Sequence, residues 1–243
     1  GGALPMKDDS QRRGKTFYYA DYRLGGGRKV YYECSFPCCS GTYPQAVAEY
    51  HNMIYYLGED GVYITQFVPS VLDAKCGQQK IHLEIAGNYP ESDTFQVLVQ
   101  SAGDYQISLR APGWAIPEEA SVAVNGEPLV DAGIQPNQWI TIRRQWSEND
   151  VVEVRFPMHL RSMGISKGHP ERAALLYGPV MLAAEGRHFT IQENPCDLRE
   201  MEKTKDGLTF CSQTKDGEPL CFRPYWSYGE GEWYSLYLDF TKA

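Results

Sequence analysis

Hydrophobic and polar residues alternate along much of the chain from Gly61 onward. In seven short runs, apolar side chains occupy every second position: Val62/Ile64, Ile81/Leu83/Ile85, Phe95/Val97/Val99, Ile107/Leu109, Val122/Val124, Ile140/Ile142 and Val152/Val154/Phe156. This period of two is typical of half-buried antiparallel strands. Turn sequences such as Asn125-Gly126 and Asn149-Asp150 separate the runs. Short strands at nearly regular spacing predict an antiparallel β-sandwich over residues 61–165.

A second group of strand-like runs follows a break near Gly164–Pro170, where glycines and a proline interrupt the pattern. Its members are Ala173–Tyr177, Val180–Ala184, Leu208–Cys211, Leu220–Arg223 and Trp233–Phe240. They predict a second, smaller β module over residues 166–243.

Residues 1–60 have a different pattern. The first 33 residues show no sustained hydrophobic period, and only Lys29–Tyr32 predicts a short strand. Further on, four apolar residues fall at spacings of three, four and three, as on one face of a helix: Val47, Tyr50, Ile54 and Leu57. A capping-box pattern at Thr42–Gln45 precedes them and Gly58 follows them. These signals predict one helix over residues 43–57.

Composition narrows the classes of function. The 243 residues carry 23 Lys and Arg against 31 Asp and Glu, a formal net charge of -8. A basic surface for nucleic acid is therefore not expected. No apolar run approaches the roughly 18 residues of a membrane span, so we expect no membrane partner. The opening Gly1–Pro5 resembles a cleavage point more than a natural start.

Cysteine distribution directs attention to one segment. Seven cysteines are an odd number, so at least one is expected to be free, metal-bound or paired with another chain. Cys34, Cys38 and Cys39 lie within six residues of one another. The other four are scattered singly, at positions 76, 196, 211 and 221. The cluster is the first place to look for chemistry.

Cys38 and Cys39 precede the expected N-cap by three or four residues. The positive end of a helix dipole there would favour a thiolate, and adjacent cysteines form a disulfide only with strain. Metal ligation or a reactive thiol is the natural reading. A zinc site would need two further ligands, for which Glu33 and Cys34 are the nearest candidates. A buried cysteine pair that only packs the helix start is the alternative.

The residues around the pair resemble a known family. Phe36–Thr42 is similar to the Cys-Cys-x-Gly-Thr element of the β-L-arabinofuranosidase-like glycoside hydrolases of families 127 and 146. Four further stretches resemble the same group in order: Gly61–Ile64 through Pro69-Ser70, Leu109–Ala115 with Val124–Gly126, Trp139 through Arg144–Trp146 with Asp150, and Arg172–Pro179.

The resemblance implies an architecture. Enzymes of this group have a catalytic (α/α)6 barrel followed by β-sandwich modules. By resemblance the chain is a C-terminal portion, with residues 1–60 as the end of the barrel, and the rest of the barrel is a missing N-terminal partner. The expected fold class is mainly β, with antiparallel β-sandwich modules preceded by a short helical remnant of that barrel.

The resemblance also implies a chemistry. Family members are retaining hydrolases in which a zinc-bound cysteine thiolate attacks the anomeric carbon. Carried over by position, Cys38 would be the nucleophile and a Zn²⁺ ligand, Cys39 a second Zn²⁺ ligand, and Tyr19 an aromatic residue lining the sugar site. The acid/base glutamate would lie upstream of this chain. The expected substrate is a carbohydrate, and this portion alone is expected to be inactive.

Two other classes of function stay open from the sequence. One is a non-catalytic β-sandwich module that binds polysaccharide or braces a neighbouring domain. Six aromatic residues between Tyr225 and Tyr237 would suit a carbohydrate platform, although strand packing explains them equally well. The other is a zinc- or redox-responsive thiol protein that uses the cysteine cluster.

Overall fold

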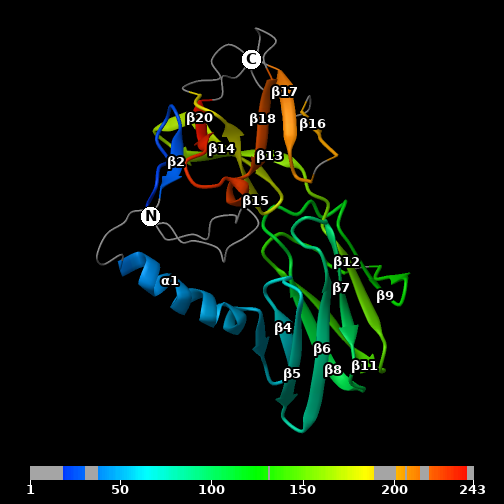
Figure 1. The fold of residues 1–243 in the computed structure, drawn as a ribbon. Helices are drawn as coiled ribbons and strands as arrows, with labels where there is room; N and C mark the ends of the chain where they lie inside the picture. Colours follow the sequence, from blue (N-terminus) through cyan, green and yellow to red (C-terminus); the bar gives the residue numbers. More distant parts are fainter. Residues whose placement is uncertain are drawn as a thin grey trace. The chain divides into compact units, whose positions relative to one another are not determined.

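Strands dominate the structure, a computed structural model that describes residues 19–30, 38–130, 132–188, 201–205, 207–213 and 219–239 (Figure 1). The mainly β fold class is confirmed. The chain forms two compact units. One is continuous, residues 48–158, and is called the sandwich unit below. The other combines residues 1–47 with residues 159–243 and is called the discontinuous unit.

The sandwich unit contains two sheets. The six-stranded sheet has the order β10-β9-β12-β7-β6-β5, with β5 (Ser70–Cys76), β6 (Gln79–Gly87), β7 (Thr94–Val99), β9 (Ser121–Val124), β10 (Glu127–Pro128) and β12 (Val151–Arg155). The four-stranded sheet has the order β11-β8-β4-β3, with β3 (Tyr55–Leu57), β4 (Gly61–Ile64), β8 (Gly103–Arg110) and β11 (Trp139–Trp146).

Alternation along these strands produces one core. The apolar positions of all seven predicted runs are buried and, with residues such as Tyr105 and Trp146, join a single cluster drawn from both sheets. The Trp146 indole N–H donates to the carbonyl of Tyr105 at 2.8 Å, so this buried ring is also satisfied as a donor. Removing these apolar faces from water is the main stabilising term of such a unit.

One strand pair departs from the antiparallel prediction. β4 runs parallel to β8, with Gly61 opposite Gln106 and Val62 opposite Ile107. Gly61 has a φ of 154°, and a Cβ atom at this position would collide with the Gln106 carbonyl. A residue without a side chain is therefore required where the two backbones approach.

The discontinuous unit contains a ten-stranded sheet. Its main path is β1-β2-β19-β15-β18-β17-β16, and β14 pairs with β13, β15 and β20. The strands are β1 (Tyr19–Ala20), β2 (Gly27–Val30), β13 (Leu160–Ser166), β14 (His169–Tyr177), β15 (Val180–Glu185), β16 (Glu202–Lys203), β17 (Phe210–Gln213), β18 (Pro219–Pro224), β19 (Trp233–Ser235) and β20 (Tyr237–Asp239). A 3-10 helix, Tyr225–Ser227, follows β18.

Pairing across the whole chain makes this unit discontinuous. Arg28 of β2 lies opposite Trp233 of β19, so the segment before the cysteine cluster shares a sheet with the last strands.

The expected break near Gly164–Pro170 is instead a hairpin between β13 and β14. Among the described strands β13 pairs only with β14, so this edge strand tolerates the register shift near Gly164. The assignment of residues 1–60 to a barrel end stays a prediction.

The single α-helix of the described residues differs from the predicted 43–57 span. α1 runs from Cys38 to Glu49, and a 3-10 helix continues from Tyr50 to Met53. The chain then enters β3, because Tyr55–Leu57 pair with Val62–Ile64 and the buried Ile54 joins the sandwich core. Sheet pairing outweighs the helical spacing at this end. No helix within the described ranges has the length and apolar character to cross a membrane.

Candidate functional site

The cysteine pair lies at the first two positions of α1 rather than ahead of it. Cys38 and Cys39 therefore belong to the first turn, where backbone N–H groups lack helical acceptors. The positive end of the helix dipole lies at this turn and favours an ionised sulfur. The side chains of both residues, and residues 31–37 with Glu33 and Cys34, lie outside the part of the chain that the structure describes. Their zinc ligation therefore stays a prediction.

α1 exposes its apolar side chains. Every described side chain from Thr42 to Met53 is exposed, with Val47 at 52% and Tyr50 at 48%, whereas Ile54 is only 6% exposed. The predicted apolar face is thus not covered by the described residues. Pro44 lies inside the helix and cannot donate a backbone hydrogen bond there. A 12-residue helix of this kind is marginal without tertiary packing.

The strand that leads toward the cysteine pair is anchored by Lys29. This side chain is fully buried, and its ammonium donates to the carbonyls of Tyr225 at 2.8 Å and Tyr228 at 3.1 Å. It also lies 4.3 Å from the centre of the Tyr225 ring. The interactions join residues almost 200 positions apart in sequence. β2 is thereby held on the C-terminal strands eight residues before Cys38.

Burial has a chemical consequence for this lysine. It lowers the Lys29 pKa from 10.5 to about 8, with a further decrease from the nearby Arg223 charge and an opposing effect of Glu232. Nothing in the sequence signalled this role, because a lysine in the strand-like run Lys29–Tyr32 is usually exposed.

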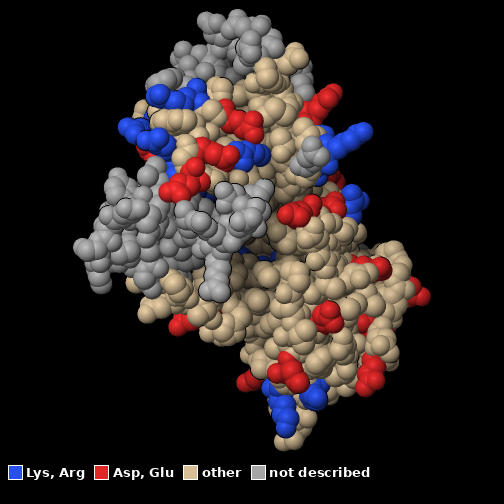
Figure 2. Space-filling view, viewed as in Figure 1, with Lys and Arg blue, Asp and Glu red and all other residues tan. Residues whose placement is uncertain are grey.

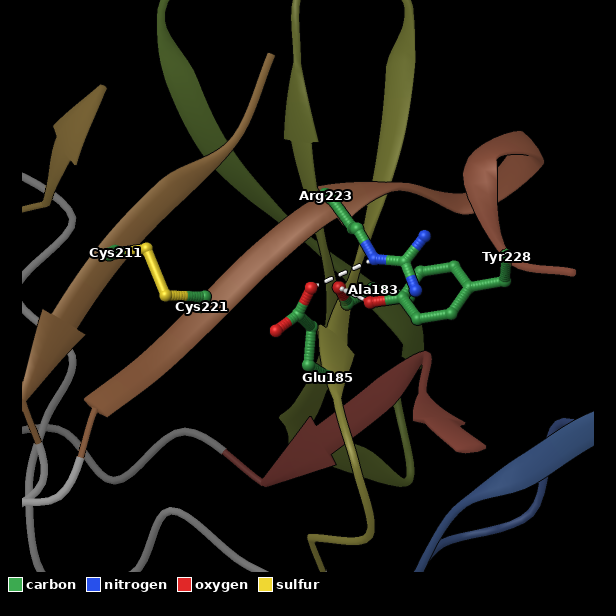
Figure 3. The surroundings of a disulfide bond; sticks show 6 residues. All are labelled: Ala183, Glu185, Cys211, Cys221, Arg223 and Tyr228. Carbon is green, nitrogen blue, oxygen red and sulfur yellow. Dashed lines mark hydrogen bonds and ion pairs between the residues drawn. A yellow bond between two sulfur atoms is a disulfide. The ribbon is translucent and has the colours of Figure 1, made fainter. Parts of the chain in front are cut away.

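Arg223 pairs with two carboxylates near this anchor. Its guanidinium lies 3.7 Å from the centre of the Tyr228 ring and pairs with Glu185 at 2.9 Å (Figure 3). It also pairs with Glu232 at 3.1 Å. Tyr228 in turn donates to the Ala183 carbonyl at 2.6 Å. Burial alone would raise the pKa of Glu232, but hydrogen bonds from the Gly229 N–H and Arg223 outweigh it and lower that pKa.

The C-terminal aromatic residues divide into two groups. Tyr225, Tyr228 and Tyr234 are buried and pack on one another, with ring centres 5.2–5.3 Å apart in the two closest pairs. Trp226 and Trp233 remain partly exposed, and the Arg28 and Arg187 guanidiniums lie 5.1 and 4.6 Å from the Trp233 ring. Strand packing accounts for the buried tyrosines, so they do not form a carbohydrate platform.

Two of the scattered cysteines form a bond that the sequence left unassigned. Cys211 and Cys221 lie directly opposite each other on β17 and β18 and form a disulfide (Figure 3). Cys76 is a free thiol whose Sγ lies 2.9 Å from the Gly58 carbonyl. Among the described residues, no three His, Cys, Asp or Glu side chains gather as metal ligands.

The remaining predicted site residue, Tyr19, lies in β1, where its partner is Val30 of β2. Its backbone is thus placed on the strand pair that precedes the cysteine cluster, but its side chain is outside the described part of the structure. His51 is exposed in the 3-10 helix after α1.

Figure 2 shows acidic and basic side chains interspersed over the described surface in view, without a continuous basic face.

The central region of the chain matches a known protein family. Residues 61–158 match the family described as Beta-L-arabinofuranosidase, GH127 middle domain. No curated protein matches the chain. Over this region the chain is similar to the GH127 β-L-arabinofuranosidases. The match ends at Met158, which is also the last residue of the sandwich unit.

Solved structures share the fold of this chain over nearly its whole length. One is Ara127N-Se, a GH127 β-L-arabinofuranosidase from Geobacillus stearothermophilus T6, with 19% identity, a TM-score of 0.64 and coverage of 89% of this chain and 39% of that one. The GH127 β-arabinofuranosidase BT3674 shows 20% identity, a TM-score of 0.62 and coverage of 91% and 41%. A structure titled glycoside hydrolase shows 16% identity, a TM-score of 0.67 and coverage of 98% and 44%.

The chain spans about two fifths of the length of these structures. At this level of identity the likeness concerns the fold. Both units of the chain fall within the aligned region, since the coverage of this chain is 89% or more.

Proposed function

We propose that the chain is the C-terminal portion of a retaining glycoside hydrolase that acts on arabinofuranoside-type or related glycans. Membership of a glycoside hydrolase family is supported by the middle-domain match. The observation that carries the proposal further is that α1 begins at Cys38, while Val47 of α1 and Tyr50 of the following 3-10 helix are exposed. A helix with these properties needs a covering partner, and a preceding barrel would supply one.

In this proposal Cys38 is the nucleophile. Its thiolate would attack the anomeric carbon, while a carboxylic acid from the preceding part of the protein protonates the departing glycosidic oxygen. Water, activated by the same carboxylate, would then release the sugar and restore the thiolate. Tyr19 would line the sugar site. Without the acid/base residue the chain alone has no complete catalytic site.

The donor chemistry of the cysteine pair suits zinc. Cys38 and Cys39 would supply two thiolates at a helix N-terminus, and Zn²⁺ prefers sulfur and nitrogen ligands. A bound Zn²⁺ would keep the Cys38 sulfur ionised at neutral pH. The fully buried Lys29 holds β2 against the C-terminal strands and would position the segment between Val30 and Cys38 from one end.

The proposal is tested by the reactivity of the thiols in the chain as it stands. Iodoacetamide labelling followed by peptide mass spectrometry, over a range of pH, reports the pKa of Cys38. We expect that pKa to lie below the usual 8.5. We also expect the zinc content of the purified chain to fall in Cys38→Ser and Cys39→Ser. Cys76→Ser is the matched control and should keep the zinc content of the parent.

Two results would count against the proposal. An ordinary thiol pKa at Cys38, together with equal zinc content in all variants, would remove the nucleophile assignment. Hydrolysis of an aryl arabinofuranoside by the chain alone would contradict its expected inactivity.

A further inference from the structure

A hollow of about 350 Å³ lies on the outward face of the six-stranded sheet of the sandwich unit. Strands β6, β7, β9 and β12 build it, and its lining includes Thr94, Gln96, Glu153 and Arg155. None of these residues belongs to the cysteine segment. The side chains face outward because their neighbours in sequence, such as Phe95 and Val154, are buried in the sandwich core.

Strand register explains the hollow. Glu153 of β12 lies opposite Gln96 of β7 on one side and Ala123 of β9 on the other, and Gln96 lies opposite Ala86 of β6. One row across four strands therefore reads Ala123, Glu153, Gln96, Ala86. Two long polar side chains stand in the middle of the row. The methyl side chains at both ends leave space that larger residues would fill.

A second row lies two residues further along the strands. Arg155 is opposite Thr94 of β7 and Ser121 of β9. The Arg155 Nε donates to the carboxylate of Asp93 at 3.0 Å, which orients the guanidinium. The two rows bring a carboxylate, an amide, a guanidinium and two hydroxyl groups to one surface.

The central pair of the first row retains its hydrogen-bonding capacity. Within the described ranges, neither the Gln96 amide nor the Glu153 carboxylate makes a hydrogen bond to another protein group, whereas Arg155 is held by Asp93. Glu153 can accept from two hydroxyl groups, and Gln96 can both donate and accept. Such a set matches neighbouring hydroxyl groups, each of which donates and accepts.

Charge selects among possible ligands. The Glu153 carboxylate disfavours an anion, and the Arg155 guanidinium disfavours a cation. The outward side chains of the two rows are polar or as small as alanine, so the rows present no large apolar side chain to a ligand. We propose that this hollow binds a neutral oligosaccharide through hydrogen bonds from Glu153, Gln96 and Arg155. The proposal shares the class of ligand with the proposed function but does not depend on Cys38.

Titration of the ¹⁵N-labelled chain, followed by NMR, tests this site. The probes are arabinotriose and xylotriose as neutral sugars and a digalacturonate as an acidic one. We expect saturable shifts with a neutral probe at amides of β7, β9 and β12 near the hollow. Glu153→Gln and Gln96→Ala should each weaken binding about tenfold, which corresponds to about 1.4 kcal/mol, because each substitution alters or removes a hydrogen-bonding group that contacts the sugar.

Asp73→Asn provides the matched control, because Asp73 is an exposed carboxylate on β5 of the same sheet and does not line the hollow. Its affinity should equal that of the parent. The proposal is overturned by absence of saturable shifts with both neutral probes, by shifts confined to other strands, by unchanged affinity in both hollow variants, or by preference for the acidic probe. The spectra themselves report whether each variant is folded. Thiol labelling at Cys38 is a separate readout, so the two proposals fail independently.

Discussion

The Asn125 amide donates to the Asp150 carboxylate at 2.8 Å and thereby links two turns of the sandwich unit. The other Asp150 oxygen accepts from the Ser147 backbone N–H at 2.9 Å, and the side-chain Oδ1 of Asn125 accepts from the Val151 backbone N–H at 2.8 Å. Asn125 has a φ of 53° and Gly126 a φ of 79°, as a two-residue hairpin turn requires. Asn125, Gly126 and Asp150 belong to the stretches that resemble the family, and they serve the architecture of the sandwich.

Replacing Asp150 should therefore lower stability. Asp150→Ala leaves the Asn125 amide and the Ser147 N–H without their acceptor, and we expect a loss of about 1–3 kcal/mol in the free energy of unfolding at pH 7. Urea denaturation measures this loss. Glu148→Ala, a neighbouring carboxylate, is the control and should change stability by less than about 0.5 kcal/mol. Equal losses in both variants would contradict the role of the link.

The same carboxylate predicts a pH dependence. The hydrogen bond from Ser147 and then that from Asn125 lower the Asp150 pKa, against a smaller opposing effect of burial. A depressed carboxyl pKa stabilises the folded state above the unfolded pKa of about 3.9, and this contribution is lost as the pH falls through the folded pKa. The difference between the parent and Asp150→Ala should shrink below about pH 4. Denaturation curves at pH 7, 4 and 3 provide the test.

Lys29 predicts a second increase of stability with pH, in the alkaline range. Its folded pKa of about 8 lies below 10.5, so the unfolded chain binds more protons between these values. The free energy of unfolding should therefore increase between pH 8 and pH 10 by up to about 2 kcal/mol, as a result of this one group. Lys29→Met should remove that increase. Lys167→Met changes an exposed lysine and serves as control; the same pH trend in parent and Lys29→Met would refute the assignment.

The disulfide predicts a stability difference in the discontinuous unit. The bond between Cys211 and Cys221 closes a loop with a sequence separation of 10, and removing such a cross-link typically costs about 2–3 kcal/mol. The double variant Cys211→Ser/Cys221→Ser should unfold at lower urea concentration than the parent. A reductant should lower the stability of Cys76→Ser and of the parent by the same amount, because Cys76 is not part of the disulfide. Alkylation of Cys211 in the unreduced, denatured chain would show that the bond is absent.

The exposure of α1 predicts a contrast between two positions of its expected apolar face. Val47→Ala should change the stability of this chain by less than about 0.5 kcal/mol because the side chain is exposed. Ile54→Ala should cost about 2–4 kcal/mol because Ile54 is buried in the sandwich core. Thermal and urea unfolding compare the two variants. A large loss in Val47→Ala would mean that α1 is covered within this chain.

The sequence by itself determined the strands and the general class of the fold. Alternation such as Phe95/Val97/Val99 is local, because successive side chains of a strand point to opposite faces. The same local signals placed a helix near the cysteine pair, but they could not place its ends. The apolar spacing that extends to Leu57 competes with pairing to β4, which depends on residues outside the helix.

Only the tertiary structure decided the features that depend on distant partners. Burial of Lys29 requires Tyr225 and Tyr228, the disulfide requires Cys211 and Cys221 to face each other across two strands, and the hollow beside Glu153 requires the register of four strands. The pattern of one segment does not contain the identity of its partner, because pairing free energy is shared by both strands. For the same reason the sequence could name Cys38 and Cys39 but could not supply the groups that surround them.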